Sequence, residues 1–152
     1  MKITTEQIKS LRGQAGAGIL ECRKALETAG GDEKKALEIL KKKGMEIAEK
    51  KRERETKQGV IETYSHNGGK VVSVVELLCE TDFVARNEEF KTLAHELAMQ
   101  VAAMNPPSIK DLLKQEYIRD ASKKIDDLVK ETVGRIRENI KIGRIARFEL
   151  GE

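Results

Sequence analysis

An Asn67-Gly68 pair lies between two runs of strand-forming residues, and this arrangement constrains the fold more than any other feature of the chain. The two runs are residues 60–64 and 71–79. Asn-Gly readily adopts the left-handed backbone conformations of a tight β-turn, so the pattern predicts an antiparallel β-hairpin. Because residues 71–79 are apolar at almost every position, we expect a central strand that is covered on both faces.

Helical patterns follow the hairpin. A helix is predicted over residues 88–104, with Asn87 as its N-cap, and Pro106 stops it because proline cannot continue a helix. A further helix is expected over residues 120–139, and a closing strand over residues 144–150. Together these elements predict an α+β fold, in which a small antiparallel sheet of about three strands packs with helices.

Residues 1–44 have a different pattern, which predicts a compact bundle of three short helices. Thr4 and Gln7 fit a capping box at the start of the first helix. Glycines are expected to end the three helices near Gly13, at Gly30-Gly31 and at Gly44. Residues 45–57 are rich in Lys, Arg and Glu with little apolar periodicity, which predicts a separate, solvated linker helix. Residues 58–152 then form the α+β body.

The composition excludes a membrane span, because no run approaches the ~20 apolar residues that one requires. The amino terminus lacks the apolar segment of a signal peptide. Cys22 and Cys79 are far apart and show no ligand spacing, so we expect buried, reduced thiols in a cytoplasmic protein. No metal-binding cluster, phosphate-binding loop or nucleophile–base grouping is present in the sequence, so we expect neither a cofactor nor an enzyme, but a protein that acts by binding.

The net charge of +3 is unevenly spread, with +5 in residues 1–57 and −2 in residues 58–152. A basic front half suggests RNA or an acidic protein face as a partner. However, the basic residues alternate with Glu, and no aromatic residue for base stacking precedes Tyr64. Direct nucleic-acid binding is therefore not expected.

Two places in the sequence carry apolar residues whose orientation the pattern leaves open. Phe83 lies where the strand of residues 71–79 meets the helix of residues 88–104. It is either a core plug or an outward anchor for a partner. Ile19 and Leu20 do not fit the inner face of the second helix, so at least one of them is expected at the glycine turn, either as a staple that closes the bundle or as a docking spot.

Two longer stretches, in this order, carry a resemblance to a known family. The first is Leu11-Arg12 followed by Gly16-Ala17-Gly18-Ile19-Leu20-Glu21-Cys22-Arg23-Lys24-Ala25-Leu26. The second is Glu80-Thr81-Asp82-Phe83-Val84-Ala85-Arg86-Asn87, and a third match is Arg147-Phe148-Glu149-Leu150-Gly151-Glu152. The chain resembles, over essentially its whole length, the elongation factor Ts family of guanine-nucleotide exchange factors for elongation factor Tu.

The resemblance implies a partner-binding site in two parts. Residues 1–44 resemble a ubiquitin-associated-type (UBA-like) domain that docks on the partner's nucleotide-binding domain, with Arg12, Ile19 and Leu20 at contact positions. The second part is Thr81, Asp82, Phe83 and Val84. Asp82 and Phe83 match the pair that faces the partner's switch region, where the aromatic ring wedges between two partner histidines and disturbs the Mg²⁺ site. The implied partner is elongation factor Tu in its GDP-bound and nucleotide-free forms.

One departure from the family concerns the length of the chain. Longer members carry a duplicated core and a helical hairpin, whereas this chain has room for a single core after Pro107. We therefore expect two copies to pair as a homodimer. Two alternatives are a ribosome- or nascent-chain-binding module without exchange activity, and an RNA-binding protein that uses Lys50, Lys51, Arg52 and Arg54.

Overall fold

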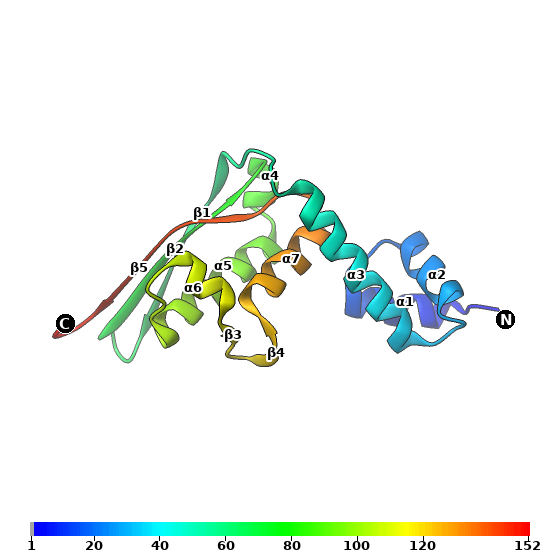
Figure 1. Ribbon diagram of the computed structural model, residues 1–152, viewed down its shortest axis with the longest axis horizontal. Coiled ribbons are helices and arrows are strands. Elements are labelled where there is room, and N and C mark those ends of the chain that lie inside the picture. Colours follow the sequence, from blue (N-terminus) through cyan, green and yellow to red (C-terminus); the bar gives the residue numbers. More distant parts are fainter. Residues whose placement is uncertain (1) are drawn as a thin grey trace.

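The computed structural model describes residues 2–152, so Met1 of the predicted first domain lies outside the described residues. A helical bundle forms one end of an elongated molecule, and a three-stranded sheet with its helices forms the other end (Figure 1). Each part has its own hydrophobic core. The α+β fold predicted from the sequence is confirmed.

The bundle consists of α1 (Thr5–Ala15), α2 (Ile19–Thr28) and the first half of α3 (Glu33–Lys51). The predicted capping box is present, since the Thr4 side chain accepts a hydrogen bond from the Gln7 backbone and the Gln7 side chain accepts one from the Thr4 backbone. α1 continues past Gly13 and ends at Gly16, whose φ of 65° is the left-handed C-cap conformation. The core of the bundle is small, comprising Leu11, Cys22, Ala25, Leu26, Ala36 and Leu40.

The prediction that the third helix ends at Gly44 and a separate linker helix spans residues 45–57 is wrong. α3 runs without a break to Lys51, and residues 52–57 connect it to the sheet without helical structure. Gly44 lies where α3 crosses α7 (Ile125–Ile136), and a Cβ added at Gly134 of α7 would lie 2.5 Å from the Gly44 Cα. The glycine pair permits close backbone contact between two helices instead of ending one of them.

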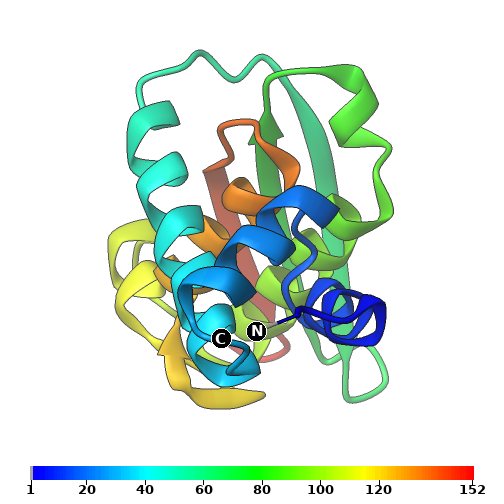
Figure 2. The same ribbon diagram turned by 90° about the vertical axis from the view of Figure 1, so that its right-hand side faces the viewer.

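The second half of α3 is also less solvated than the sequence predicts. Ala48 is 6% exposed and belongs to the hydrophobic core of the body. α3 therefore contributes to both cores, and Figure 2 shows it beside α7 when the molecule is viewed from the bundle end. The division of the chain into domains at residues 44 and 57 remains a prediction.

The sheet has the order β1-β2-β5 and is antiparallel throughout. β1 (Gln58–His66) and β2 (Val71–Cys79) form the predicted hairpin, with Asn67 and Gly68 at φ values of 55° and 66°. β5 (Lys141–Glu149) pairs with the other edge of β2. β2 is therefore the central strand.

The expectation that β2 is covered on both faces is wrong. Its residues alternate between buried and half-buried, because α5 (Glu88–Met104) and the other helices of the body cover one face only. On the opposite face, Ile61 of β1 is 64% exposed and Phe148 of β5 is 70% exposed. Apolar residues on both sides of a strand are typical of a sheet that is covered by a layer on each face. Here the described residues supply a layer on one face only.

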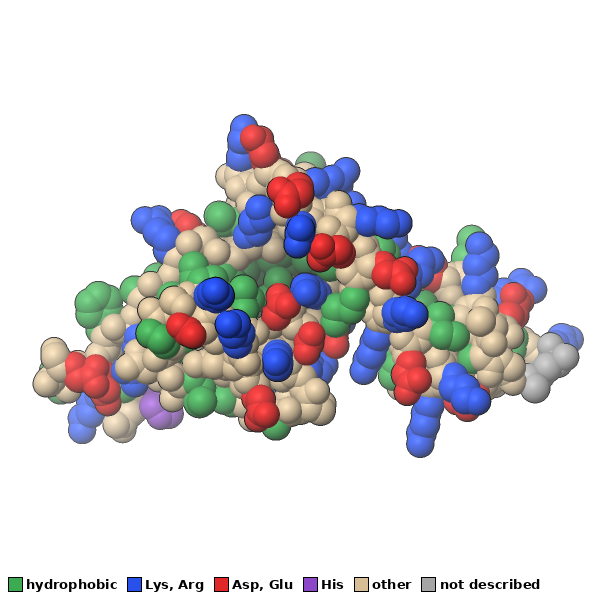
Figure 3. Space-filling view, in the orientation of Figure 1, with side chains coloured by type: hydrophobic (Ala, Val, Ile, Leu, Met, Phe, Trp, Pro, Cys, Tyr) green, Lys and Arg blue, Asp and Glu red, His purple; other side chains and the backbone are tan. Residues whose placement is uncertain are grey.

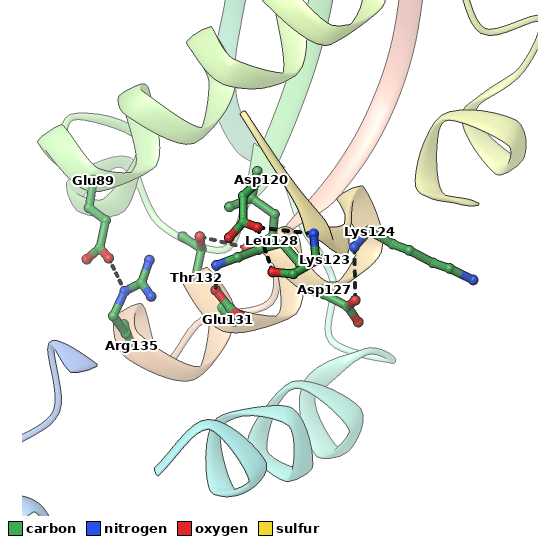
Figure 4. Close-up of polar contacts among 10 residues, drawn as sticks. Glu89, Asp120, Lys123, Lys124, Asp127, Leu128, Glu131, Thr132 and Arg135 are labelled. Carbon is green, nitrogen blue, oxygen red and sulfur yellow. Dashed lines mark hydrogen bonds and ion pairs between the residues drawn. The ribbon is translucent and has the colours of Figure 1, made fainter. Parts of the chain in front are cut away.

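The segment between α5 and β5 is more complex than the sequence predicts. α5 ends before the two prolines as expected, and Asn105, at φ 46°, is its C-cap. It is followed by α6 (Ile109–Lys114) and by a small hairpin of β3 (Glu116–Tyr117) and β4 (Asp120–Lys124). The helix predicted over residues 120–139 therefore begins five residues later and ends at Ile136. Asp127 accepts the Lys124 backbone N–H and so fixes the start of α7 (Figure 4).

The close contact between α3 and α7 leads to a prediction for glycine substitutions. We expect Gly134→Ala to lower the free energy of unfolding by about 1–3 kcal/mol, because the new methyl group meets the backbone of Gly44. Gly13→Ala is the matched control, since nothing lies within 4 Å of a Cβ at that helical position. It should raise stability by about 0.5–1 kcal/mol. Urea unfolding of both variants measures the two values, and equal effects would contradict the packing role of Gly134.

Candidate partner-binding site

The bundle presents two apolar side chains beside its first glycine turn. Gly18 is the N-cap of α2, and Ile19 and Leu20 are the first two residues of that helix. They are 55% and 71% exposed, because the inner face of α2 is formed by Cys22, Ala25 and Leu26. Both residues, and not only one, are available to a partner. Neither acts as a staple that closes the bundle.

Arg12 lies in the last turn of α1, the helix that precedes the glycine turn. Its side chain is exposed and forms no ion pair with any residue in the part of the chain that the structure describes. The Arg12 carbonyl accepts the Gly16 N–H, so the residue is tied to the same turn that leads to Ile19. An exposed arginine is a residue type that is enriched in protein interfaces.

Phe83 lies on α4 (Asp82–Ala85), a single helical turn at the junction between β2 and α5. It is 76% exposed, so the core-plug interpretation is wrong. Its ring lies 5.7 Å from the Arg86 guanidinium carbon, and Arg86 also donates to the Asp82 carboxylate at 3.1 Å. Asp82 and Phe83 therefore project together from the surface.

Thr81 and Val84 face the protein more than the solvent. The Thr81 hydroxyl accepts the Val84 N–H at 3.3 Å and so caps α4, while the Val84 side chain packs against the core of the body. The four residues predicted at this site thus divide into two that project and two that anchor the turn. Sequence reasoning missed Glu138, whose carboxylate accepts hydrogen bonds from this turn, because it lies 57 residues from Thr81.

Polar contacts hold the bundle against the body. The Glu21 carboxylate accepts from Arg137 at 2.5 Å and pairs with Lys43 of α3 at 3.0 Å. Hydrogen bonds from these two cations lower the pKa of Glu21 to about 2. Arg135 of α7 lies across Gly16 and pairs with Glu89 of α5 (Figure 4).

A cleft of about 430 Å³ lies between the bundle and the body and is bordered by α3 and α7. Its walls mix glycine and aliphatic residues with paired charges, such as Lys123 with Glu131. The bundle forms a second lobe beyond this indentation (Figure 3). The ion pair between Glu21 and Arg137 and the packing of the Arg135 side chain on Gly16 cross the junction, so they restrain the bundle relative to the body.

The two cysteines and the two histidines pack against other residues of the fold. Burial raises the pKa of the Cys79 thiol to about 11 and also raises that of Cys22. His66 and His95 both lie against the ring of Tyr64. Within residues 2–152, no group of three His, Cys, Asp or Glu side chains could hold a metal ion. The helices of that range also include none with the length and hydrophobicity of a membrane span.

The basic residues of the RNA-binding alternative are partly neutralised. Arg52 pairs with Glu49 at 3.1 Å and Glu53 at 3.5 Å, and Arg54 pairs with Glu80 at 3.5 Å. Phosphate binding depends on cations that are free to replace counterions. These pairs therefore weaken the case for a nucleic-acid interface.

Comparisons with a family model and with known proteins all match the same protein family. The family model described as "Elongation factor TS" matches residues 80–152. Elongation factor Ts of Thermotoga petrophila is 43% identical over 195 aligned positions, which cover 100% of this chain and 98% of that protein. Elongation factor Ts of Thermotoga maritima is 42% identical with the same coverage, and that of Coprothermobacter proteolyticus is 39% identical with 100% of both chains covered.

The contact between the bundle and the body should depend on pH. A folded-state pKa of about 2 for Glu21, against an ordinary value of 4.5, means that its ionised form stabilises the fold at pH values above 4.5. This contribution is lost as the pH falls from 4.5 to 2. We expect the difference in unfolding free energy between the wild type and Glu21→Gln to be constant near neutral pH and to vanish near pH 2.

The matched control is Glu27→Gln, which removes a carboxylate on the same helix from an exposed pair with Arg23. It should change stability little, because exposed pairs contribute at most about 1 kcal/mol. Urea titrations between pH 7 and pH 2.5 make the comparison. A stability difference for Glu21→Gln that persists unchanged at pH 2.5 would show that the carboxylate charge is not involved.

Proposed function

Because the chain belongs to the elongation factor Ts family, we propose that it binds elongation factor Tu and promotes the release of GDP. Membership of the family supports a role as a translation elongation factor. The observation that carries the finer proposal is the 76% exposure of Phe83 on a capped turn, together with a second exposed apolar site at Ile19 and Leu20. An exposed aromatic side chain on a fixed turn is a typical anchor for a partner protein.

The proposed action is exchange by binding, without a catalytic group. The chain needs only to bind nucleotide-free elongation factor Tu more tightly than the GDP-bound form. By linkage, it then weakens the binding of GDP by the same factor by which GDP weakens the binding of the chain. No bond is made or broken by a residue of this chain, so the protein is an exchange factor and not an enzyme.

We assign different roles to the two parts of the site. Arg12, Ile19 and Leu20 dock the bundle on the nucleotide-binding domain of the partner, and this contact supplies affinity in both nucleotide states. Phe83 and Asp82 then engage the switch region beside the Mg²⁺ site, where the ring wedges between two partner histidines. Thr81 and Val84 hold the turn that presents them. Only the second contact needs to differ between the two states of the partner.

A homodimer is part of the proposal. The uncovered sheet face carries the apolar residues Ile61, Val72, Val74, Leu78, Ala146 and Phe148. An apolar sheet face without a covering layer is typical of an interface. The alignment with the Thermotoga petrophila protein spans 195 positions against the 152 residues of this chain, so about 43 positions of it have no counterpart here. A second copy on this face is the covering layer that we propose.

The main test is GDP release from elongation factor Tu, followed by stopped-flow fluorescence of a labelled nucleotide. The wild-type chain should accelerate release, and Phe83→Ala should reduce the acceleration by up to about 100-fold. This limit follows because burying a Phe side chain contributes about 2–3 kcal/mol and each ~1.4 kcal/mol is tenfold. Ile118→Ala is the control, since it truncates an exposed apolar side chain (44% exposed) outside both parts of the site.

The outcomes separate the candidate functions. Acceleration that survives Phe83→Ala unchanged would contradict the proposed role of the ring. A ribosome- or nascent-chain-binding module would use the same exposed residues of the bundle but would leave GDP release unaffected by the wild-type chain.

The dimer can be tested by light scattering across a range of concentrations. We expect the wild type to have twice the 17.0 kDa mass of the chain and Phe148→Glu to have the monomer mass, because a buried unpaired charge disfavours association. Lys110→Glu serves as the control, since it also introduces a negative charge but at an exposed position of α6, on the side of the sheet that the helices cover. A wild-type mass of one chain at all concentrations would exclude this part of the proposal.

A further inference from the structure

We propose that Glu138 is a positioning residue that fixes the direction in which Phe83 leaves the surface. Glu138 lies between α7 and β5 and belongs to neither element. This inference rests on the proposed function, because it explains how the turn that would contact elongation factor Tu is held in the free protein.

The carboxylate of Glu138 binds the residues just before α4. One of its oxygens accepts the backbone N–H groups of Glu80 at 3.1 Å and Thr81 at 3.0 Å. The other accepts the Thr81 hydroxyl at 2.7 Å. Hydrogen bonds to an ionised acceptor are shorter and stronger than those between neutral groups. Three of them converge here on two consecutive residues.

The Thr81 hydroxyl transmits this restraint to α4. A hydroxyl has one proton and two lone pairs. Since its proton is donated to Glu138, a lone pair is left to accept the Val84 N–H, which it does at 3.3 Å. Glu138 thus selects the orientation of the group that caps the helix. A helix of four residues is unstable on its own, so the cap decides whether the turn is ordered.

The Glu138 backbone is itself held by its neighbours. The Asn139 N–H donates to the Glu80 carboxylate at 2.6 Å, which returns a bond from the segment that Glu138 binds. The buried Asn139 side chain donates to the carbonyls of Arg52 at 3.2 Å and Arg54 at 2.7 Å. Arg137, on the other side, binds Glu21 of the bundle. Three consecutive residues therefore connect the bundle, the end of α3 and the turn of Phe83.

Phe83 depends on this arrangement because it lies outside the hydrophobic core. The ring is 76% exposed, and the Arg86 guanidinium that lies over it belongs to the same turn. Its direction is consequently set by the α4 backbone. A side chain that is already in its bound orientation loses less conformational entropy on binding, which increases affinity.

The first experiment measures the free chain by NMR. Glu138→Gln keeps the shape of the side chain but replaces one acceptor oxygen by a donating NH2 group, so the side chain can no longer accept both from the backbone N–H groups and from the Thr81 hydroxyl. We expect the backbone order parameters of Phe83 and Val84 to fall from about 0.85 to 0.6 or less. Glu131→Gln is the matched control: its carboxylate lies on α7 and pairs with Lys123, away from the turn, and it should leave these values unchanged.

The second experiment measures GDP release from elongation factor Tu in a double-mutant cycle. Glu138→Gln should reduce the acceleration about tenfold in the wild-type background and have no further effect in the Phe83→Ala background, because it acts only through the ring. An equal reduction in both backgrounds, or unchanged order parameters in the free chain, would overturn the proposal. If the wild-type chain fails to accelerate release, the proposed function is wrong, while the NMR comparison still decides whether Glu138 orders the turn.

Discussion

The close packing of α3 against α7 is the contact on which the rest of the molecule depends. The first half of α3 completes the core of the bundle through Ala36 and Leu40, and its second half places Ala48 in the core of the body. The two halves are one continuous helix, and Gly44 and Gly134 let it approach α7 at backbone distance. A small bundle with six buried core side chains gains little stability by itself. Its attachment to a helix that is anchored elsewhere supplies both stability and a fixed orientation.

This rigid attachment fixes the position of the two exposed apolar sites relative to each other. Ile19 and Leu20 lie at one end of the molecule, and Phe83 lies at the junction of β2 and α5. If the two sites were joined by a flexible linker, each binding event would carry its own entropic cost. Under the proposed function, both sites contact one partner and are held by one body, so the second contact would form at a high effective concentration once the first has formed. The ion pair between Glu21 and Arg137 and the packing of the Arg135 side chain on Gly16 serve the same purpose, because they restrict motion of the bundle against the body.

Local signals in the sequence predicted the local features of this fold. The β1–β2 hairpin, the Thr4 capping box and the Asn87 cap each depend on residues within a few positions of one another, and all are present. The predictions were wrong where a structural feature depends on residues that are far apart in the sequence. Gly44 has the sequence signature of a helix end, yet it meets Gly134, which lies 90 residues away. The partial exposure of β2 depends on how many layers cover the sheet, and the contact of Glu138 with Thr81 joins segments without any shared motif.

The orientation of Phe83 at the candidate site also could not be predicted from the sequence pattern alone. Composition and periodicity left Phe83 either inside or outside, and the resemblance to a family favoured the outside. The structure gives the physical reason: Ala85 and Val84 turn toward the core, so a one-turn helix that also carries Asp82 and Phe83 must direct those two outward. An apolar ring in water has a free-energy cost that the fold could avoid by burying it. Its persistence on a turn capped by Thr81 and bound by Glu138 supports the proposed function, in which a partner surface covers the ring.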